Sequence, residues 1–187
     1  MKIALLGGSF NPPHMSHQLV CRHLLDNAGF DRVWLMPCFR HAFGKTLAAF
    51  DDRLQMCALA AKPFSGKVIV SEIEQVLAAN KENRTIDTVI YIKEQYPEDQ
   101  FVLIIGSDIL FEFDHWKDSK KLRQIIDILV VRRQGYEEIT GDWNATDKIF
   151  PVQSSTTIRE KLAAGESING LVPEEVETYL LENKLYK

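Results

Sequence analysis

Residues 2–17 have the sequence KIALLGGSFNPPHMSH, and this stretch decides the fold. Residues 2–6 form a short apolar run that stops at two glycines, which is typical of a buried parallel strand. Residues 15–28 then carry apolar side chains at helical spacing, and residues 32–36 form a second apolar run. The chain therefore begins with a strand–helix–strand unit, the building block of parallel sheets.

The same alternation continues to the C-terminus. Further strands are expected at residues 67–70, 101–105, 127–131 and, weakly, 149–152. Helices are expected at residues 85–95, 109–113, 119–126, 155–164 and 173–183, and in a segment that Asp51 or Asp52 caps and that ends at residue 61. This order predicts an α/β fold, a Rossmann-like doubly wound parallel sheet with helices on both faces. No internal repeat or linker is found, so residues 1–187 are expected to form a single domain.

The composition excludes several classes of protein. Hydrophobic residues make up 45% of the chain, enough for a core, and the formal net charge is −4. Basic residues occur only in short clusters, which argues against a nucleic-acid partner. No apolar run approaches the roughly 20 residues of a membrane span, and no cleavable leader precedes the first strand. The three cysteines match no zinc pattern and are expected to be reduced thiols in the cytoplasm: Cys21, Cys38 and Cys57.

The turn after the first strand is the first candidate site. Gly7 and Gly8 would let the main chain turn sharply and approach a ligand closely. The helix that begins near Met15 would direct its free N–H groups to the same place, which favours an anion. His14 and His17, three residues apart, share a face of the first helical turn. This cluster suits a polyphosphate; the alternative is a glycine turn with two structural histidines. A dinucleotide fingerprint is excluded because no third glycine follows in place.

A second candidate site opens the helix near the C-terminus, where residues 154–159 have the sequence SSTTIR. Hydroxyl groups such as those of Ser155 and Thr156, with the free N–H groups of a helix start, can hold phosphate. Arg159 lies three residues beyond Thr156, on the same side of the helix. The alternative, which is compatible with phosphate binding, is a capping box formed by Thr157 and Glu160.

Polar residues also follow the fourth and fifth predicted strands. Ligands of parallel sheets bind past the carboxyl ends of the strands, where Gly106 and Asp108 are expected. Asp108 is either a ligand or the cap of the next helix. Trp116 has polar neighbours, so we expect it at the surface or in a pocket, where an indole can stack on a pyridine ring. Arg132 and Arg133 end a strand and could reach phosphates or frame an adenine; the alternative is two solvated charges.

These motifs resemble those of a known superfamily. Residues 8–17 resemble the G-x-F-x-P-x-H-x-G-H signature of the nucleotidyltransferases related to class I aminoacyl-tRNA synthetases, with Ser16 where the signature has glycine. Residues 153–159 resemble the motif I-S-S-T-x-I-R of the same superfamily, with Gln153 where it has isoleucine. The polar residues after the fourth and fifth predicted strands, and the closing segment at residues 171–186, resemble those of bacterial nicotinate mononucleotide adenylyltransferases. This resemblance covers nearly the whole chain.

The resemblance implies transfer of AMP from ATP to nicotinate mononucleotide, giving deamido-NAD and pyrophosphate in NAD biosynthesis, with Mg²⁺ carried on the triphosphate and no metal site in the protein. It implies catalytic roles for His14, His17 and Arg159. The ATP-binding residues it implies are Gly7, Gly8, Ser9, Phe10, His14, His17, Lys45, Gly106, Asp108, Arg132, Arg133, Ser155, Thr156 and Arg159. The mononucleotide-binding residues it implies are Ser9, Phe10, Arg84, Thr85, Asp108 and Trp116.

Two of these assignments fall where the chain departs from the family. The family's Pro-Pro-His-Lys loop is absent here, and the resemblance implies that Lys45 keeps its cationic role. Residues 83–85, NRT, replace a Ser-Tyr-Thr turn whose main-chain amides hold the nicotinate carboxylate. Main-chain amides need no particular side chain, so Arg84 does not forbid this contact.

Several alternatives stay open from the sequence. The acceptor could be nicotinamide mononucleotide, or the chain could be a phosphopantetheine or cytidylyl transferase of the superfamily. A nucleotide-binding protein without turnover is a further alternative. His23 is expected to be packed rather than catalytic, whereas His41 and His115 have no assigned role. Many relatives self-associate, so a homo-oligomer is possible.

Overall fold

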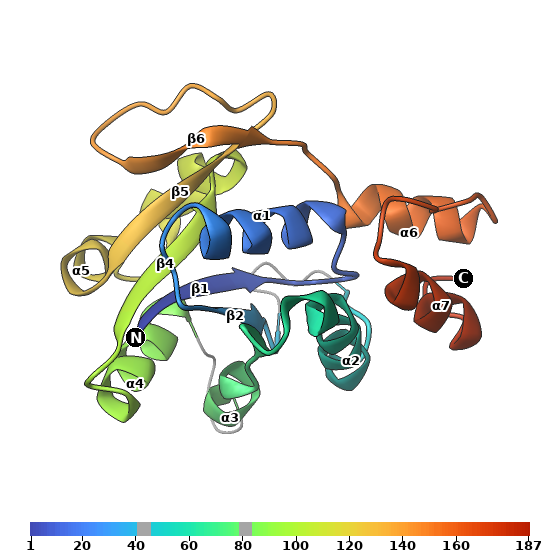
Figure 1. Cartoon of the computed structure of the whole chain (residues 1–187), viewed down its shortest axis with the longest axis horizontal. Helices are drawn as coiled ribbons and strands as arrows, with labels where there is room; N and C mark the ends of the chain where they lie inside the picture. Colours follow the sequence, from blue (N-terminus) through green and yellow to red (C-terminus); the bar gives the residue numbers. More distant parts are fainter. Residues whose placement is uncertain (41–45, 79–83) are drawn as a thin grey trace.

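The computed structural model describes residues 1–40, 46–78 and 84–187, and a parallel sheet lies at its centre (Figure 1). The six strands are β1 (Lys2–Gly8), β2 (Arg32–Pro37), β3 (Val68–Val70), β4 (Gln100–Gly106), β5 (Asp127–Arg133) and β6 (Asn144–Phe150). They pair in the order β3-β2-β1-β4-β5-β6, and every neighbouring pair is parallel. The predicted doubly wound sheet is thus confirmed, and its order reverses between β1 and β4.

Helices cover both faces of the sheet. They are α1 (Met15–Asp26), α2 (Phe50–Ala61), α3 (Ile73–Ala78), α4 (Thr85–Gln95), α5 (Ser119–Ile125), α6 (Ser155–Ala163) and α7 (Glu174–Glu182), with 3₁₀ helices η1 (Lys62–Phe64) and η2 (Ser107–His115). Because side chains alternate along a strand, Ala4 and Leu6 pack towards α1 and α2. Ile3 and Leu5 pack towards α4, α5 and η2 on the opposite face.

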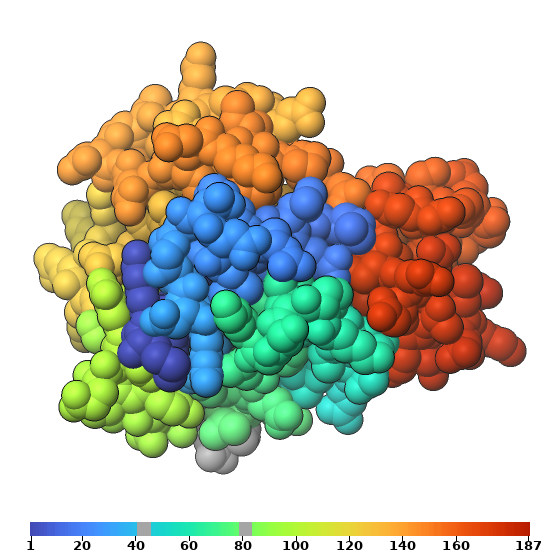
Figure 2. All heavy atoms as spheres, viewed as in Figure 1, coloured from blue at the N-terminus to red at the C-terminus, as the bar shows by residue number. Residues whose placement is uncertain are grey.

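The last two helices form a separate layer beyond the sheet. Figure 1 shows α6 and α7 past the end towards which β1 runs. Their buried residues, such as Ile158 and Leu180, pack with Met56 and Ala60 of α2 in a third apolar cluster. In the space-filling view of Figure 2, this C-terminal segment lies against the start of α1 and against α2. The layer therefore brings residues beyond 154 next to the N-terminal turn.

The structure corrects some predicted boundaries. α2 begins at Phe50 after Ala49, so Asp51 and Asp52 lie in its first turn and do not cap it. β6 runs from Asn144 to Phe150 rather than over residues 149–152. As an edge strand it buries only Thr146 and Phe150, which leaves little apolar pattern to detect. The short elements η1 and α3 were not predicted.

Two further predictions concern the environment of the chain. No helix in residues 1–40, 46–78 or 84–187 is long and apolar enough to cross a membrane. The three cysteines are free thiols, and Cys21 and Cys57 are buried.

Candidate active site

The turn after β1 lies at Phe10 rather than at the glycines. β1 continues through Gly7 and Gly8, and the chain turns where Phe10 adopts a φ of 45° and the Asn11–Pro12 peptide is cis. The prediction of a turn at the glycine pair is therefore wrong. A Cβ on Gly8 would lie 3.3 Å from the Phe10 ring, whereas a Cβ on Gly7 would meet nothing within 4 Å. The main chain at Gly7 is thus open to a ligand.

The Phe10 side chain belongs to the core. It is 1% exposed and packs in the apolar cluster between the sheet and α1. Only the main chain of Phe10 is therefore available to ATP or a mononucleotide. The buried ring holds the turn against the sheet and lies with its centroid 4.8 Å from that of His17.

His14 and His17 form a stacked pair at the start of α1, with ring centroids 3.7 Å apart. The main-chain N–H of His14 donates to Nδ1 of His17 at 3.1 Å. Because Nδ1 accepts this bond, a neutral His17 carries its proton on Nε2. Nδ1 of His14 is buried and has no hydrogen-bond partner within the described residues.

Both imidazoles are neutral at pH 7. Burial, assisted by the charge of Arg133, lowers the pKa of His14 to about 3. Burial also lowers the pKa of His17 well below its ordinary value, with smaller contributions from His14 and Arg133. These side chains are therefore hydrogen-bonding groups rather than cations, and Arg133 is the positive charge that acts on both.

The first N–H groups of α1 are not free, contrary to prediction. Met15 N donates to the Leu171 carbonyl at 3.0 Å, and His17 N donates to that of His14 at 2.9 Å. Ser16 N donates to Oε1 of Gln153 at 2.8 Å. The reason is tertiary: the helix begins against the segments that flank α6, and these supply acceptors. Anion binding at this end of α1 would therefore rely on side chains.

The start of α6 lies directly against the N-terminal turn. Oγ of Ser155 donates to the Pro12 carbonyl at 2.9 Å, and Nη1 of Arg159 donates to the Asn11 carbonyl at 2.8 Å. Nη2 of Arg159 also donates to Oγ1 of Thr156 at 3.1 Å. The structure thus brings the two motifs together, although more than 140 residues separate the bonded groups in sequence.

The cap of α6 differs from the predicted one. The helix begins one residue after Ser154, whose Oγ accepts from Thr156 N at 3.1 Å. A capping box of Thr157 and Glu160 is excluded because both residues already lie inside the helix. Thr156 therefore has its N–H occupied and its hydroxyl shared with Arg159 in the structure.

An ion pair lies where β4 and β5 end. Nε of Arg133 lies 3.5 Å from Oδ1 of Asp108, which does not cap η2. A Cβ on Gly106 would lie 2.1 Å from that carboxylate oxygen, so this contact requires glycine. Arg132 points to the other face of β5, where Nη1 donates to the Glu137 carbonyl at 3.0 Å. Only one of the two arginines therefore lies near the histidines.

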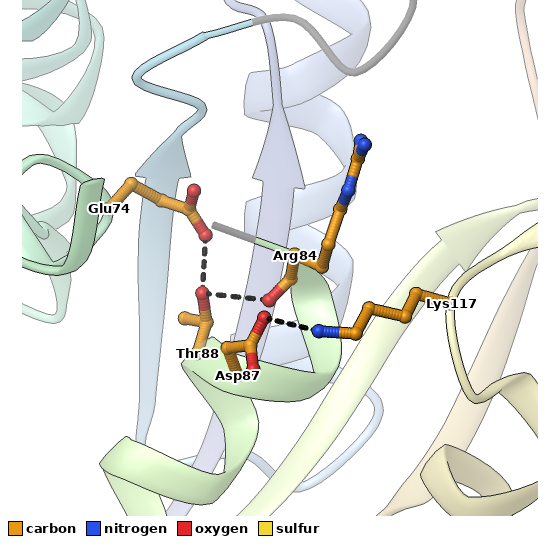
Figure 3. Close-up of polar contacts among 5 residues, drawn as sticks. All are labelled: Glu74, Arg84, Asp87, Thr88 and Lys117. Atoms are coloured by element: carbon orange, nitrogen blue, oxygen red, sulfur yellow. Dashed lines mark hydrogen bonds and ion pairs between the residues drawn. The ribbon is translucent and has the colours of Figure 1, made fainter. Parts of the chain in front are cut away.

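Four of the six predicted mononucleotide residues lie in or next to α4 and η2, and Figure 3 shows one of them, Arg84. Arg84 and Thr85 begin α4, and the Arg84 side chain extends in the direction in which the neighbouring strands run. Oγ1 of Thr88 lies 2.6 Å from Oε1 of Glu74, which joins α4 to α3. Trp116 follows η2, is half-buried and packs with its ring centroid 5.4 Å from that of Phe113. Lys45 and His41 lie outside the described residues.

An ion pair connects these two elements. Nζ of Lys117 lies 3.4 Å from Oδ2 of Asp87, so it links α4 to the residue after Trp116 (Figure 3). The lysine side chain is 51% exposed. The pair is therefore a solvent-screened contact rather than a rigid tie.

Arg53 was not predicted and is the largest fully buried side chain of the described residues. Its guanidinium donates to four main-chain carbonyls, those of Ala48, Ser9, Cys38 and Phe39. It therefore joins the turn after β1, where Ser9 lies, to the segment after β2. A sequence signal existed, because residue 53 shares one helical face with the buried residues 56, 57, 60 and 61.

Asn11 is a second buried residue that sequence reasoning did not single out. Its Oδ1 accepts from the Tyr186 hydroxyl at 2.6 Å and from Ala48 N at 2.9 Å. Its carbonyl accepts from Arg159, as described above. The last residues of the chain thus hold the N-terminal turn in place. Burial raises the pKa of Tyr186, so its hydroxyl stays protonated and can donate.

A cavity of about 550 Å³ lies beyond the carboxyl ends of β4 and β5. Its lining is aromatic and acidic and includes neither histidine of the stacked pair. The lining residues are Ser107, Leu110, Phe111, Asp114, Gly135, Tyr136, Glu137, Glu138, Thr140 and Trp143. Phe111 is 69% exposed and adds apolar surface to this lining. The sequence did not predict this lining because its residues follow no spacing pattern.

The chain is similar to proteins of a known family. Residues 5–161 match the cytidylyltransferase-like family model. A probable nicotinate-nucleotide adenylyltransferase of Anaeromyxobacter dehalogenans is 42% identical over 186 residues, covering 100% of this chain and 97% of the relative. One from Myxococcus xanthus is 37% identical over 186 residues, covering 100% and 95%.

Solved structures share the fold. Nicotinic acid mononucleotide adenylyltransferase of Plasmodium falciparum, complexed with NaAD, superposes with a TM-score of 0.83 at 20% identity, covering 99% of this chain and 97% of that one. A putative nicotinate-nucleotide adenylyltransferase of Vibrio parahaemolyticus gives a TM-score of 0.73 at 24% identity, covering 99% and 94%. Full-length identity above 30%, the matched family model and the shared fold agree, and the chain belongs to the nicotinate-nucleotide adenylyltransferase family of cytidylyltransferase-like proteins.

Proposed function

We propose that this chain transfers AMP from ATP to nicotinate mononucleotide, giving deamido-NAD and pyrophosphate. The observation that carries the proposal is the direct contact between the two motifs, in which Arg159 and Ser155 donate to the main chain of the turn that leads into His14 and His17. Family membership supports the reaction, and the Plasmodium relative is described as complexed with NaAD.

The reaction needs positioning more than proton abstraction. A phosphate oxygen of the mononucleotide attacks the α-phosphorus of ATP, and the bond from that phosphorus to the oxygen bridging to the β-phosphorus breaks. The attacking phosphate is already ionised at neutral pH, so no strong base is required. Catalysis then consists of alignment and of stabilising charge on the phosphoryl oxygens.

The phosphate-binding groups divide into two sets. His14 and His17 would contact the α-phosphate, and the Nε2–H of His17 is a ready donor because Nδ1 is occupied. Thr156 and Arg159, with Ser155, would hold the β- and γ-phosphates. Gly7, Gly8 and Ser9 would let the triphosphate approach the main chain. Arg133 would supply positive charge between the two sets.

Mg²⁺ is proposed to enter with ATP. Within residues 1–40, 46–78 and 84–187, no three histidine, cysteine or acidic side chains gather into a cluster that could hold a metal ion. Triphosphate oxygens are ligands that Mg²⁺ prefers, and the ion usually keeps several waters. When bound, it would neutralise charge on the leaving pyrophosphate.

The acceptor is proposed to lie across the ends of β1 and β4. Asp108 would accept from ribose hydroxyls, Trp116 would stack on the pyridine ring, and Arg84 and Thr85 would receive its carboxylate. A cationic Arg84 favours an acid over an amide, which supports nicotinate over nicotinamide mononucleotide. We also propose that the whole chain works as one cytoplasmic domain; the three free cysteines support that compartment.

The decisive experiment supplies Mg-ATP with one acceptor at a time. Nicotinate mononucleotide, nicotinamide mononucleotide and phosphopantetheine are tested separately, and the products are separated by chromatography while pyrophosphate is assayed. We expect deamido-NAD from the first at the highest kcat/KM. A higher kcat/KM for nicotinamide mononucleotide would overturn the acceptor assignment. ATP binding without pyrophosphate release for any acceptor would overturn the enzyme assignment.

A further inference from the structure

Ser16 and Gln153 contact each other inside the protein. Ser16 is 0% exposed and lies between the two histidines in the first turn of α1. Its N–H donates to Oε1 of Gln153 at 2.8 Å, and its Oγ lies 3.3 Å from the same oxygen. Its hydroxyl also donates to the Pro151 carbonyl at 2.8 Å. Gln153 immediately precedes the N-cap residue of α6.

This contact differs from the other bonds between the two motifs. The Ser155–Pro12 and Arg159–Asn11 bonds use side chains that are themselves proposed to bind phosphate. When the triphosphate arrives, those side chains must share or give up their bonds. Neither Ser16 nor Gln153 is proposed to touch a substrate, so their bond is able to persist while ATP is bound.

The sequence carries the same signal. Ser16 and Gln153 are the positions at which this chain departs from the two motifs it otherwise resembles, and the structure places them in contact. A hydrocarbon side chain at residue 153 could not accept from the buried N–H of Ser16. A buried donor without an acceptor costs free energy, so the amide oxygen at residue 153 has a defined role.

We propose that Ser16 and Gln153 act as a positioning pair for adenylyl transfer. The pair holds the start of α6 at a set distance and angle from His14 and His17. One triphosphate is then held by the imidazoles at its α-phosphate and by α6 at its β- and γ-phosphates. This inference rests on the proposed function.

The test is Gln153→Leu, which removes the acceptor but keeps the approximate volume. We expect kcat with nicotinate mononucleotide to fall about tenfold, because small misplacements of reacting groups slow a step that depends on alignment. We expect KM for ATP to change less than threefold, because each set of donors still reaches its own phosphates. Thermal melting and the stoichiometry of ATP binding give the folded fraction to which kcat is normalised.

Two further variants separate positioning from general stability. Gln153→Glu keeps an acceptor oxygen, so kcat should return to within threefold of wild type, whereas the added charge beside the triphosphate raises KM for ATP. Ser16→Gly keeps the main-chain N–H that donates to Gln153 and removes only the hydroxyl bonded to the Pro151 carbonyl, so its kcat should fall less than that of Gln153→Leu. Ser119→Ala is the matched control. Ser119 is a buried serine at the start of α5, and its hydroxyl donates to the Asp114 carbonyl. The variant should keep wild-type kcat.

The outcomes distinguish the inference from the function beneath it. If the wild-type protein turns over and Gln153→Leu has the same kcat, the positioning pair alone is overturned; a loss of kcat in Ser16→Gly as large as that in Gln153→Leu does the same. Absence of deamido-NAD with the wild-type protein overturns the proposed function and the pair with it. If Gln153→Leu does not fold, Gln153→Asn, which withdraws the oxygen by one methylene, replaces it with the same expected loss of kcat.

Discussion

The phosphate side and the acceptor side of this site are built differently. On the phosphate side, buried residues such as Arg53 and Asn11 join the turn after β1 to other segments by short hydrogen bonds. Those to α2 and α6 use main-chain carbonyls, and the one to the C-terminal segment joins the Asn11 side chain to the Tyr186 hydroxyl. On the acceptor side, the elements around Trp116 are linked by the exposed Asp87–Lys117 pair and border a cavity with an exposed aromatic wall.

This contrast fits the chemistry of the two substrates. Stabilising a phosphoryl transition state requires donors that do not reorganise, and buried main-chain contacts provide that rigidity. Holding an aromatic ring requires apolar surface and tolerates side-chain adjustment. Substitutions on the phosphate side should therefore change kcat or folding strongly, whereas those on the acceptor side should change KM for the mononucleotide modestly.

The largest expected effect follows His17→Ala. Removing one transition-state donor typically costs about 10²–10³ in rate, so kcat should fall by that factor. The free energy of unfolding should also fall, because His14 loses the ring on which it stacks. This fall should be smaller than the rise in the activation free energy. Steady-state kinetics with chemical denaturation measures both. His23→Ala, in the same helix and packed on Phe150, is the control and should keep wild-type kcat. Wild-type turnover in folded His17→Ala would remove His17 from catalysis.

Arg53→Met should lower the free energy of unfolding by about 3 kcal/mol, because four buried carbonyls lose their donor. Urea denaturation measures the change. Arg22→Met, at an exposed arginine of α1, should change stability by less than about 0.5 kcal/mol. Equal stability of Arg53→Met and wild type would show that the phosphate side does not depend on this buried charge.

Stability should also depend on pH through His14. Its pKa is about 3 in the folded state, against an ordinary value of 6.5, so the unfolded chain binds more protons between these values. The His14 contribution is complete above pH 6.5 and is lost as the pH falls towards 3. For one group, the free energy of unfolding changes by at most about 1.4 kcal/mol per pH unit. Urea denaturation from pH 7 to pH 4 should show a shallower slope for His14→Gln; equal slopes would contradict the burial argument.

Trp116→Ala should raise KM for nicotinate mononucleotide about tenfold, since ring stacking contributes about 1 kcal/mol in addition to lost contact area. KM for ATP should stay within twofold. Trp34→Phe, at a buried tryptophan of β2 that packs on Tyr96 and Phe101, should leave both constants unchanged. A rise in KM for ATP alone would show that Trp116 contacts ATP rather than nicotinate mononucleotide.

The smallest effect is expected for Asp87→Asn. Its ion pair with Lys117 is partly exposed, and such pairs contribute about 0–1 kcal/mol. KM for nicotinate mononucleotide should change less than threefold, and the change should vanish at high salt. A tenfold change that persists in 0.5 M salt, in the same kinetic assay, would show that the acceptor side is as rigidly held as the phosphate side.

Local sequence determined the fold class and the identity of the chemical groups. Apolar runs broken by glycine and proline marked β1, β2, β4 and β5 well, because buried parallel strands are nearly all apolar. The edge strand β6 and the short α3 were misplaced or missed because they bury few side chains. His14, His17 and Arg159 were identifiable because their motifs are contiguous in the chain.

Only the tertiary structure decided which backbone and side-chain groups remain available to a ligand. It showed that α1 begins against the segments flanking α6, so its first N–H groups already have acceptors. It also showed that Arg133 rather than Arg132 faces Asp108, and that Ser16 meets Gln153 across 137 residues. Hydrogen-bond satisfaction between distant segments depends on packing in three dimensions, and a linear pattern of residue types does not contain it.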